Sequence, residues 1–116
     1  MKIKTSELTG AALDWAVAIV FNPAYEWGEW KPSTNWAQGG PIIEKEQIDL
    51  RYSKNKWVAE WWPNNSGMAK NPAQRFRHNI YTTGESPLIA AMRCYVASKL
   101  GDEVEIPQKE ADHVLG

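Results

Sequence analysis

Cysteine and histidine are scarce in this sequence, which has one cysteine, Cys94, and two histidines, His78 and His113. A single cysteine cannot form an intramolecular disulfide, and neither histidine has a second ligand at the spacing of a zinc-binding pair. Few cysteines also agree with a reducing compartment. We therefore expect a fold without disulfides, no metal site and no cofactor.

Long apolar runs and an excess of positive charge are also missing. No run approaches the roughly 18 apolar residues of a membrane-spanning helix, and the first residues, MKIKTSELTG, lack the apolar core of a signal peptide. The formal net charge is -1, whereas binding to nucleic acid without sequence preference needs Lys and Arg to neutralise phosphates. We expect a cytoplasmic protein that binds neither a membrane nor double-stranded nucleic acid.

The length and composition fit one domain. With 116 residues, of which 43% are hydrophobic and 23% charged, the chain is long enough to bury a core without cross-links. We expect a single domain over residues 1–116. Residues 63–74 are rich in Asn, Gly, Ser and Pro and predict a flexible loop, and residues 108–116 predict a frayed tail.

Two stretches have the apolar periodicity of helices. Near the N-terminus, an apolar stripe that includes Leu13 and Val17 follows Thr9, a suitable N-cap, and the helix should end before Pro23. A second helix should begin at Ser86-Pro87, because serine before proline is a favoured helix start.

Alternating apolar residues predict strands between these helices. The alternation covers residues 48–52 and 56–62, which the turn at 53–55 should join into a hairpin, and residues 75–82 predict a third strand. This order predicts an α+β fold, a small antiparallel sheet of three to four strands covered by helices in the manner of an α-β-α sandwich.

The stretch NWAQGGPIIE combines an indole, an amide, two glycines and a proline. We expect a short helix from Ser33 or Thr34 to Glu46, interrupted at Gly39-Gly40-Pro41. The glycine spacing matches no phosphate-binding fingerprint, so a turn or kink is the simpler interpretation. A ligand contact remains the alternative, because glycine lets a ligand approach the backbone closely.

Tryptophan is the abundant residue. Seven tryptophans and four tyrosines exceed what a domain of this size easily buries, so some should form an exposed binding face. The tryptophans are Trp15, Trp27, Trp30, Trp36, Trp57, Trp61 and Trp62.

Basic side chains cluster on the expected third strand. A solvated strand face is the simpler interpretation of Arg75 and Arg77. With Arg93 from the last helix they could instead hold an anion, because guanidinium groups stack well on indoles. Basic side chains, a glycine turn and surplus tryptophans are the ingredients of a nucleotide-sized pocket, so we predict a site for a small anionic, nucleotide-like ligand. Its residues are Trp36, Gln38, Gly39, Gly40, Trp57, Arg75 and Arg77.

Catalytic signals are weak. Cys94 lies inside a predicted helix, where an isolated cysteine is usually a small buried apolar residue. The acidic group Glu44, Glu46 and Asp49 is better explained as a solvated helix end than as an acid and base pair. A small enzyme is therefore the least favoured class.

Three stretches together resemble the NinX-like proteins of tailed phages and prophages: KTSELTGAALDWAVA, NWAQGGPIIE and SPLIAAMRCYVASKLGDEVEIP. The family is similar to a wider set of phage proteins with α-β-α sandwiches, which share a leading helix, the Trp57-Val58-Ala59 strand and a helix after Ser-Pro. The resemblance supplies no catalytic residues.

The resemblance implies an accessory protein of an infected bacterial host cell, used in host takeover or counter-defence. The first hypothesis is sequestration of a nucleotide-like signal, without catalysis. The alternative is inhibition of a host or defence protein through a tryptophan-rich face that includes Trp27, Trp30 and Trp62. Either site could also form between copies of a homo-oligomer.

Overall fold

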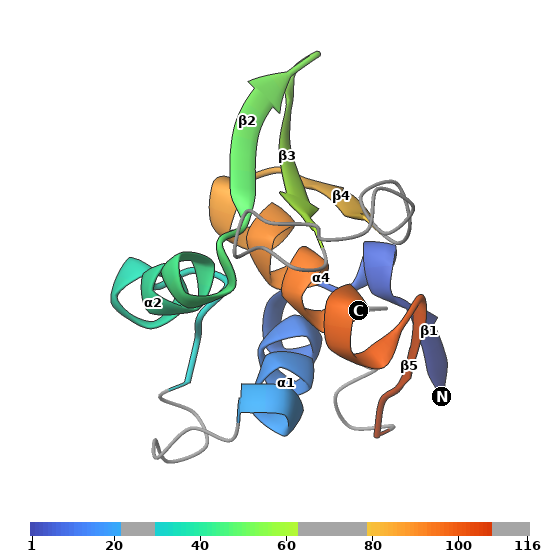
Figure 1. Ribbon diagram of the computed structural model, residues 1–116. Helices are drawn as coiled ribbons and strands as arrows, with labels where there is room; N and C mark the ends of the chain where they lie inside the picture. Colours follow the sequence, from blue (N-terminus) through green and yellow to red (C-terminus); the bar gives the residue numbers. More distant parts are fainter. Residues whose placement is uncertain (22–29, 63–78, 108–116) are drawn as a thin grey trace, which may run out of the picture.

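The computed structural model describes residues 1–21, 30–62 and 79–107 (Figure 1). Several sequence-based predictions fall outside these ranges and stay predictions. They concern the loop at 63–74, the tail at 108–116, Trp27, Arg75, Arg77 and both histidines.

The α1 helix, Gly10–Phe21, begins directly after Thr9, as the sequence predicts. Its apolar stripe is in the core, because Leu13 and Val17 have no exposed surface, and Leu8, just before the helix, is equally buried. The stripe packs on the second long helix, so burial of one face holds α1 in place.

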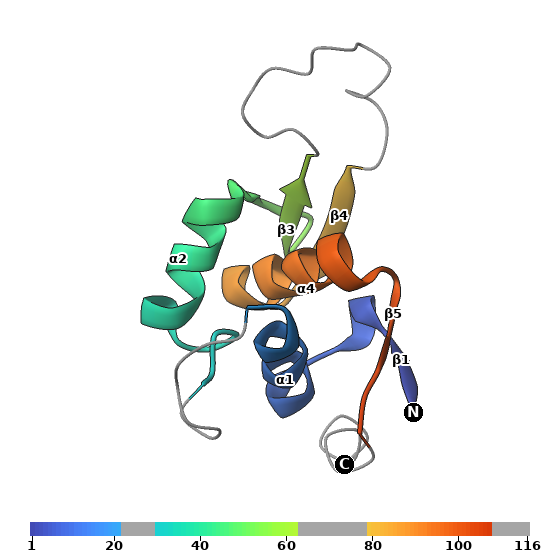
Figure 2. The ribbon, with the colours of Figure 1, turned by 60° about the horizontal axis from the view of Figure 1, so that its bottom comes forward.

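The α4 helix, Pro87–Leu100, lies between the strands and α1 (Figure 2). Its start is the predicted one: the Ser86 hydroxyl accepts a hydrogen bond from the Ile89 N–H at 3.1 Å, and Pro87 opens the helix. Met92 and Val96 are fully buried. Because α4 contacts the strands on one side and α1 on the other, it is the centre of the core.

The main sheet consists of β2 (Asp49–Ser53), β3 (Lys56–Trp61) and β4 (Ile80–Gly84), all antiparallel and in that order. The β2–β3 hairpin is confirmed. Its two turn residues, Lys54 and Asn55, have φ of 52° and 65°, which is typical of a two-residue turn whose twist matches the strands.

The third strand ends two residues later than predicted, at Gly84 rather than at Thr82. Its first described strand residue is Ile80, and the predicted residues 75–78 lie outside the described ranges. Gly84 lets the strand pass close to α4, because a Cβ there would lie 2.6 Å from the Ala90 nitrogen. The two-residue period at 75–82 could not reveal this close approach, which depends on the helix that follows.

A second, two-stranded sheet was not predicted. It pairs β1 (Lys2–Lys4) with β5 (Glu103–Glu105), so the two ends of the described chain lie side by side (Figure 1). Lysine faces glutamate at both outer pairs, while Ile3 and Val104 are buried in the centre. Strands of three residues are too short to show a period in the sequence.

The α2 helix, Trp36–Glu46, corrects two expectations about NWAQGGPIIE. Its N-cap is Asn35, whose side chain accepts a hydrogen bond from the Ala37 N–H at 2.9 Å, rather than Ser33 or Thr34. The helix also runs through Pro41 without interruption. Ile42, almost completely buried, anchors the turn that contains the proline, so packing offsets the lost backbone hydrogen bond.

The predicted α+β class is confirmed: helices and antiparallel strands are separate along the chain, and α4 packs against all three strands of the main sheet. No helix in the described ranges is long and apolar enough to cross a bilayer.

Candidate functional site

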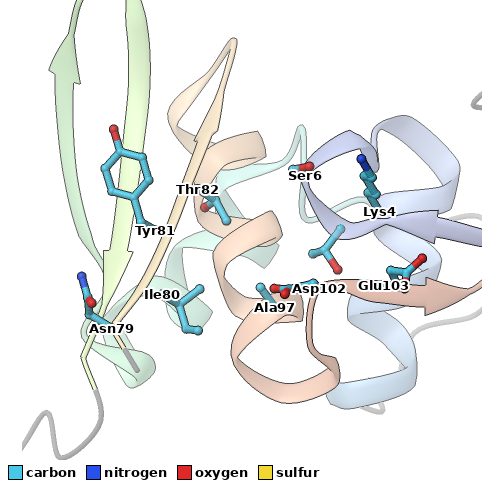
Figure 3. A pocket seen from close by; sticks show the side chains of 10 residues that line it. Lys4, Ser6, Asn79, Ile80, Tyr81, Thr82, Ala97, Asp102 and Glu103 are labelled. Carbon is cyan, nitrogen blue, oxygen red and sulfur yellow. The ribbon is translucent and has the colours of Figure 1, made fainter. Parts of the chain in front are cut away.

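A cleft of about 550 Å³ lies between β4 and the β1–β5 sheet (Figure 3). In Figure 3 the β4 residues stand on one side, Lys4, Ser6, Asp102 and Glu103 stand on the other, and Ala97 of α4 lies between them. The full lining is Lys4, Thr5, Ser6, Asn79, Ile80, Tyr81, Thr82, Ala97, Asp102 and Glu103. The cleft therefore runs along the side of β4 that does not pair with β3.

Hydrogen bonds fix the wall opposite β4. Thr5, in a short 3-10 turn over Thr5–Glu7, donates from its backbone N–H to the Asp102 carbonyl at 2.7 Å. The Thr5 hydroxyl donates to the Gly101 carbonyl at 2.6 Å. These two bonds join the turn after β1 to the segment before β5, so the fold itself holds this wall of the cleft in place.

Arg93 of α4 forms hydrogen bonds that link the edge of β4 to the segment before α1. Its Nε donates to the Leu8 carbonyl at 2.7 Å and its Nη1 to the Thr83 carbonyl at 2.8 Å. Burial lowers the pKa of this guanidinium and Glu85 raises it. The sequence suggests Arg93 as an anion ligand, whereas in the structure its guanidinium donates hydrogen bonds to two backbone carbonyls.

Charge in the cleft is mixed. Asp102 and Glu103 contribute two carboxylates and Lys4 one ammonium group, and all three residues are exposed. The remaining polar lining groups include the Ser6 hydroxyl and the Asn79 amide. Such a lining suits hydrogen bonding and a cationic group better than a phosphate.

A polar network stands on the outer face of the sheet beside this cleft. Arg51 forms an ion pair with Glu60 at 3.0 Å, and the Asn79 amide donates to the second carboxylate oxygen of Glu60 at 2.6 Å. The Arg51 guanidinium also lies 5.9 Å from the centre of the Tyr81 ring. The network positions the ring of Tyr81, which is 57% exposed, next to the cleft.

Two residues of the predicted ligand site, Gln38 and Gly39, lie on the buried side of α2. The Gln38 side chain accepts a hydrogen bond from the Lys31 N–H. Gly39 allows a close approach, because a Cβ there would lie 2.5 Å from the Pro32 carbonyl oxygen and 2.6 Å from Leu88 Cδ2. Both positions therefore have a packing role in joining α2 to the 31–35 turn and to α4.

The other described residues of that prediction differ in exposure. Trp36 is 54% exposed at the start of α2, and Gly40 is half-buried on the same helix. Trp57 in β3 is half-buried, and its ring meets Tyr52 edge-on at 5.4 Å. Their grouping with Arg75 and Arg77 stays a prediction, because both arginines lie outside the described ranges.

The alternative tryptophan face is partly in the core. Trp30 is only 3% exposed and stacks on Phe21 at 5.4 Å, so packing accounts for this indole. Trp62 is half-buried after the end of β3. The exposed large apolar side chains of the described residues are instead led by Tyr52, Tyr81, Ile19 and Trp36.

Two buried titratable groups belong to the scaffold. Burial raises the pKa of the Cys94 thiol to about 12, so this thiol remains protonated near neutral pH. Asp14 of α1, which the sequence did not single out, is buried and accepts a hydrogen bond from the Ser33 N–H at 2.9 Å. Burial raises the pKa of this carboxyl, while Ser33 and Lys31 lower it.

A group of three or more metal-ligating side chains does not occur among residues 1–21, 30–62 and 79–107. The cleft could not be predicted from the sequence, because the walls of the cleft come from β4 and from the two distant segments that form the β1–β5 sheet. Only the pairing of β1 with β5 brings Lys4 and Glu103 together.

Fold and site together define a small α+β protein with a mixed-charge cleft beside an edge strand. A family model described as "Bacteriophage P22, NinX" matches residues 20–99, more than half of the chain. The chain therefore belongs to this phage protein family, as its three resembling stretches predicted. No curated protein matched the sequence.

Proposed function

We propose that this NinX-family protein is a phage accessory protein that binds another protein and performs no catalysis. The observation that carries the proposal is the cleft beside β4, whose lining combines hydroxyl, amide and carboxylate groups with the exposed edge of a sheet. Backbone and side chains of a protein segment offer partners for all of these groups.

The absence of a catalytic role is supported by the state of the buried groups. Cys94 is a buried thiol with a raised pKa, and Arg93 is held by carbonyl groups of the scaffold. A nucleophile would instead need a lowered pKa or an adjacent base. Both side chains therefore fit structural roles.

The setting of the family suggests the purpose of such binding. The family match places the chain among phage proteins, and small accessory proteins of phages frequently act on the host cell. We propose host takeover or counter-defence as the biological role. Occupying a host or defence protein requires a surface that is available in the folded monomer. The cleft meets this requirement, because the charged residues of its β1–β5 wall, Lys4, Asp102 and Glu103, are exposed.

Sequestration of a nucleotide-like anion is the second candidate. It is favoured by Trp36, whose ring is 54% exposed and available to stack on a base, and by the basic pair Arg75 and Arg77 in the sequence. This site would be separate from the cleft, because Asp102 and Glu103 repel phosphate groups.

One comparison separates the two candidates. Tagged wild-type protein and a Glu103→Lys variant capture proteins from phage-infected host cells, and each captured protein is purified and titrated back by calorimetry. Protein binding predicts a purified partner whose affinity falls with Glu103→Lys. Binding of cyclic or linear nucleotides, lost in Trp36→Ala and unaffected by Glu103→Lys, would instead support the second candidate.

A further inference from the structure

The two edges of the main sheet differ in their protection. The strand β2, at one edge, carries Asp49 and Arg51, and charges on an edge strand discourage pairing with another chain. The strand β4, at the other edge, reads Ile-Tyr-Thr-Thr-Gly and carries neither charge nor proline. Its first four residues are also good strand formers. Of the two edges of the described sheet, the one that faces the cleft is therefore the better suited to accept a further strand.

The register shows which β4 groups point into the cleft. A two-residue turn makes Ser53 and Lys56 a hydrogen-bonded pair, and such pairs occur at every second position along antiparallel strands. Every second residue of β3, starting at Lys56, therefore bonds to β2, and the residues between them, such as Ala59, bond to β4. Ala59 pairs with Thr82, so Thr82 bonds to β3, whereas Tyr81 and Thr83 direct their backbone N–H and C=O groups away from it. The bond from Arg93 to the Thr83 carbonyl agrees, because Arg93 also bonds Leu8 beyond that edge.

Tyr81 is therefore the position at which β4 can accept a new partner. Arg93 already occupies the Thr83 carbonyl. Within the described ranges, no hydrogen bond from outside the main sheet reaches the backbone of Tyr81. A single extended segment would pair with its N–H and C=O groups.

The walls restrict what can enter. Thr5 and Ser6 stand opposite Ile80 and Tyr81 across a space of about 550 Å³. That volume is within the range of small-ligand pockets and holds a few residues of extended chain. In a second copy of the protein, β4 also lies beside its own β1–β5 wall. Pairing of two β4 edges would bring these walls into each other's strands, so pairing between two copies is sterically disfavoured.

We propose that the cleft takes an extended segment of another protein, which adds as a strand to β4 and places a lysine or arginine beside Asp102 and Glu103. Side chains alternate along such a segment, so one side meets Ile80 and Ala97 while the other side faces solvent. On this wall Asp102 and Glu103 outnumber Lys4, so its net negative charge favours a basic side chain by charge complementarity. This inference rests on the proposed protein-binding function and gives that function a recognition mode.

Synthetic peptides test the mode without a known partner. The probes are about eight residues long, enough for one strand, with alternating threonine and valine and a single lysine moved through the sequence. A matched panel carries glutamate in place of lysine, and a third carries N-methyl groups on alternate backbone nitrogens. We expect binding of the best lysine peptide near or below about 1 mM and about tenfold weaker binding of its glutamate and N-methyl counterparts.

Two proline variants form a matched pair on opposite edges. Tyr81→Pro removes an N–H that points into the cleft, and Tyr52→Pro removes an N–H that points away from β3 at the β2 edge. Neither N–H bonds to β3, so both variants should fold. We expect Tyr81→Pro to lose peptide binding and Tyr52→Pro to keep it.

Each other outcome overturns the recognition mode. Equal binding of lysine and glutamate peptides excludes the acidic wall as a determinant, and unchanged binding of N-methyl peptides or of Tyr81→Pro excludes strand addition. If no peptide binds and wild-type protein dimerises in sedimentation while Tyr81→Pro does not, the occupant is a second copy. A partner that binds Tyr81→Pro as tightly as wild type would leave the proposed protein-binding function intact and refute only this inference.

Discussion

Arg93 and Thr83 are joined by a 2.8 Å hydrogen bond from a helix guanidinium to a strand carbonyl. The same side chain reaches Leu8 at 2.7 Å, so one residue of α4 links the start of α1 to the edge of β4. The bond fixes the position of the edge strand and occupies one of its outward carbonyls. Arg93 therefore limits how much of the edge is open to a partner.

Replacing Arg93 should destabilise the fold. The Arg93→Met variant leaves the Leu8 and Thr83 carbonyls without their charged donor, which we expect to cost about 2–3 kcal/mol of unfolding free energy. Urea unfolding measures the change. The control is Arg51→Met, which removes an ion pair whose arginine is about half exposed and leaves Glu60 its hydrogen bond from Asn79, so it should cost less, about 1 kcal/mol. Equal losses in the two variants would refute a clamping role for Arg93.

The neighbouring glycines of α2 should respond oppositely to alanine. Gly39→Ala forces a Cβ against Pro32 and Leu88, which we expect to destabilise the protein by about 1–3 kcal/mol. Gly40→Ala meets nothing closer than 3.9 Å and should be neutral or stabilising by up to about 1 kcal/mol, because alanine favours helices. Thermal unfolding of both variants checks the difference. A tolerated Gly39→Ala would show that α2 does not pack as described.

Asp14 should make stability depend on pH. Burial raises the pKa of this carboxyl above its usual 3.8, so the folded state holds its proton more tightly than the unfolded state does. Its contribution to stability is therefore largest at low pH and is lost as pH rises from about 3.8 through the folded pKa. An asparagine side chain at this position cannot ionise but can still accept the Ser33 hydrogen bond.

The Asp14→Asn variant tests this sign. Its unfolding free energy relative to wild type should rise as pH increases from about 3 to about 7 in a series of urea titrations. Asp14→Ala is the control, because it leaves the Ser33 N–H unpaired and should be less stable than Asp14→Asn across this range. A difference between wild type and Asp14→Asn that does not change with pH would contradict the raised pKa.

Cys94 should be inert in the folded protein. Burial keeps the thiol protonated, so iodoacetamide at about pH 8 should modify it about tenfold or more slowly in native protein than in urea. Mass spectrometry follows the modification. Rapid labelling under native conditions would show that the thiol is accessible and would reopen a nucleophilic role for it.

The sequence predicted well the features that depend on local patterns. The Ser86-Pro87 helix start, the turn at 53–55 and the stripe through Leu13 and Val17 each follow from neighbouring residues. All three are present, with the turn formed by Lys54 and Asn55 alone. The α+β class follows from the order of these elements. The family could also be predicted from the sequence, because the stretches that resemble it include these same helix signals.

Features that depend on contacts between distant segments were missed. The pairing of Lys2–Lys4 with Glu103–Glu105 joins strands too short to have a period, and the cleft wall depends on that pairing. The continuous α2 helix was also missed, because a Gly-Gly-Pro sequence normally breaks a helix. Here the contacts of Gly39 and the burial of Ile42 keep the helix intact.

The candidate ligand residues show the same division. Residue type alone grouped Gln38 and Gly39 with Trp36, but the period of a continuous helix places the first two inside and leaves Trp36 exposed. Tyr81 and Asp102, which line the cleft, carry no motif in the sequence. Their importance comes from the edge position of β4, which only the sheet order reveals.

Amide hydrogen exchange by NMR tests the central claim most directly, because it reports the two sides of β4 separately. In free protein the Tyr81 amide should exchange faster than the Thr82 amide, which is directed at β3. Addition of the best lysine peptide should slow exchange at Tyr81 by about tenfold or more and leave Thr82 nearly unchanged. Unchanged exchange at Tyr81 while the peptide is bound would contradict strand addition at this edge.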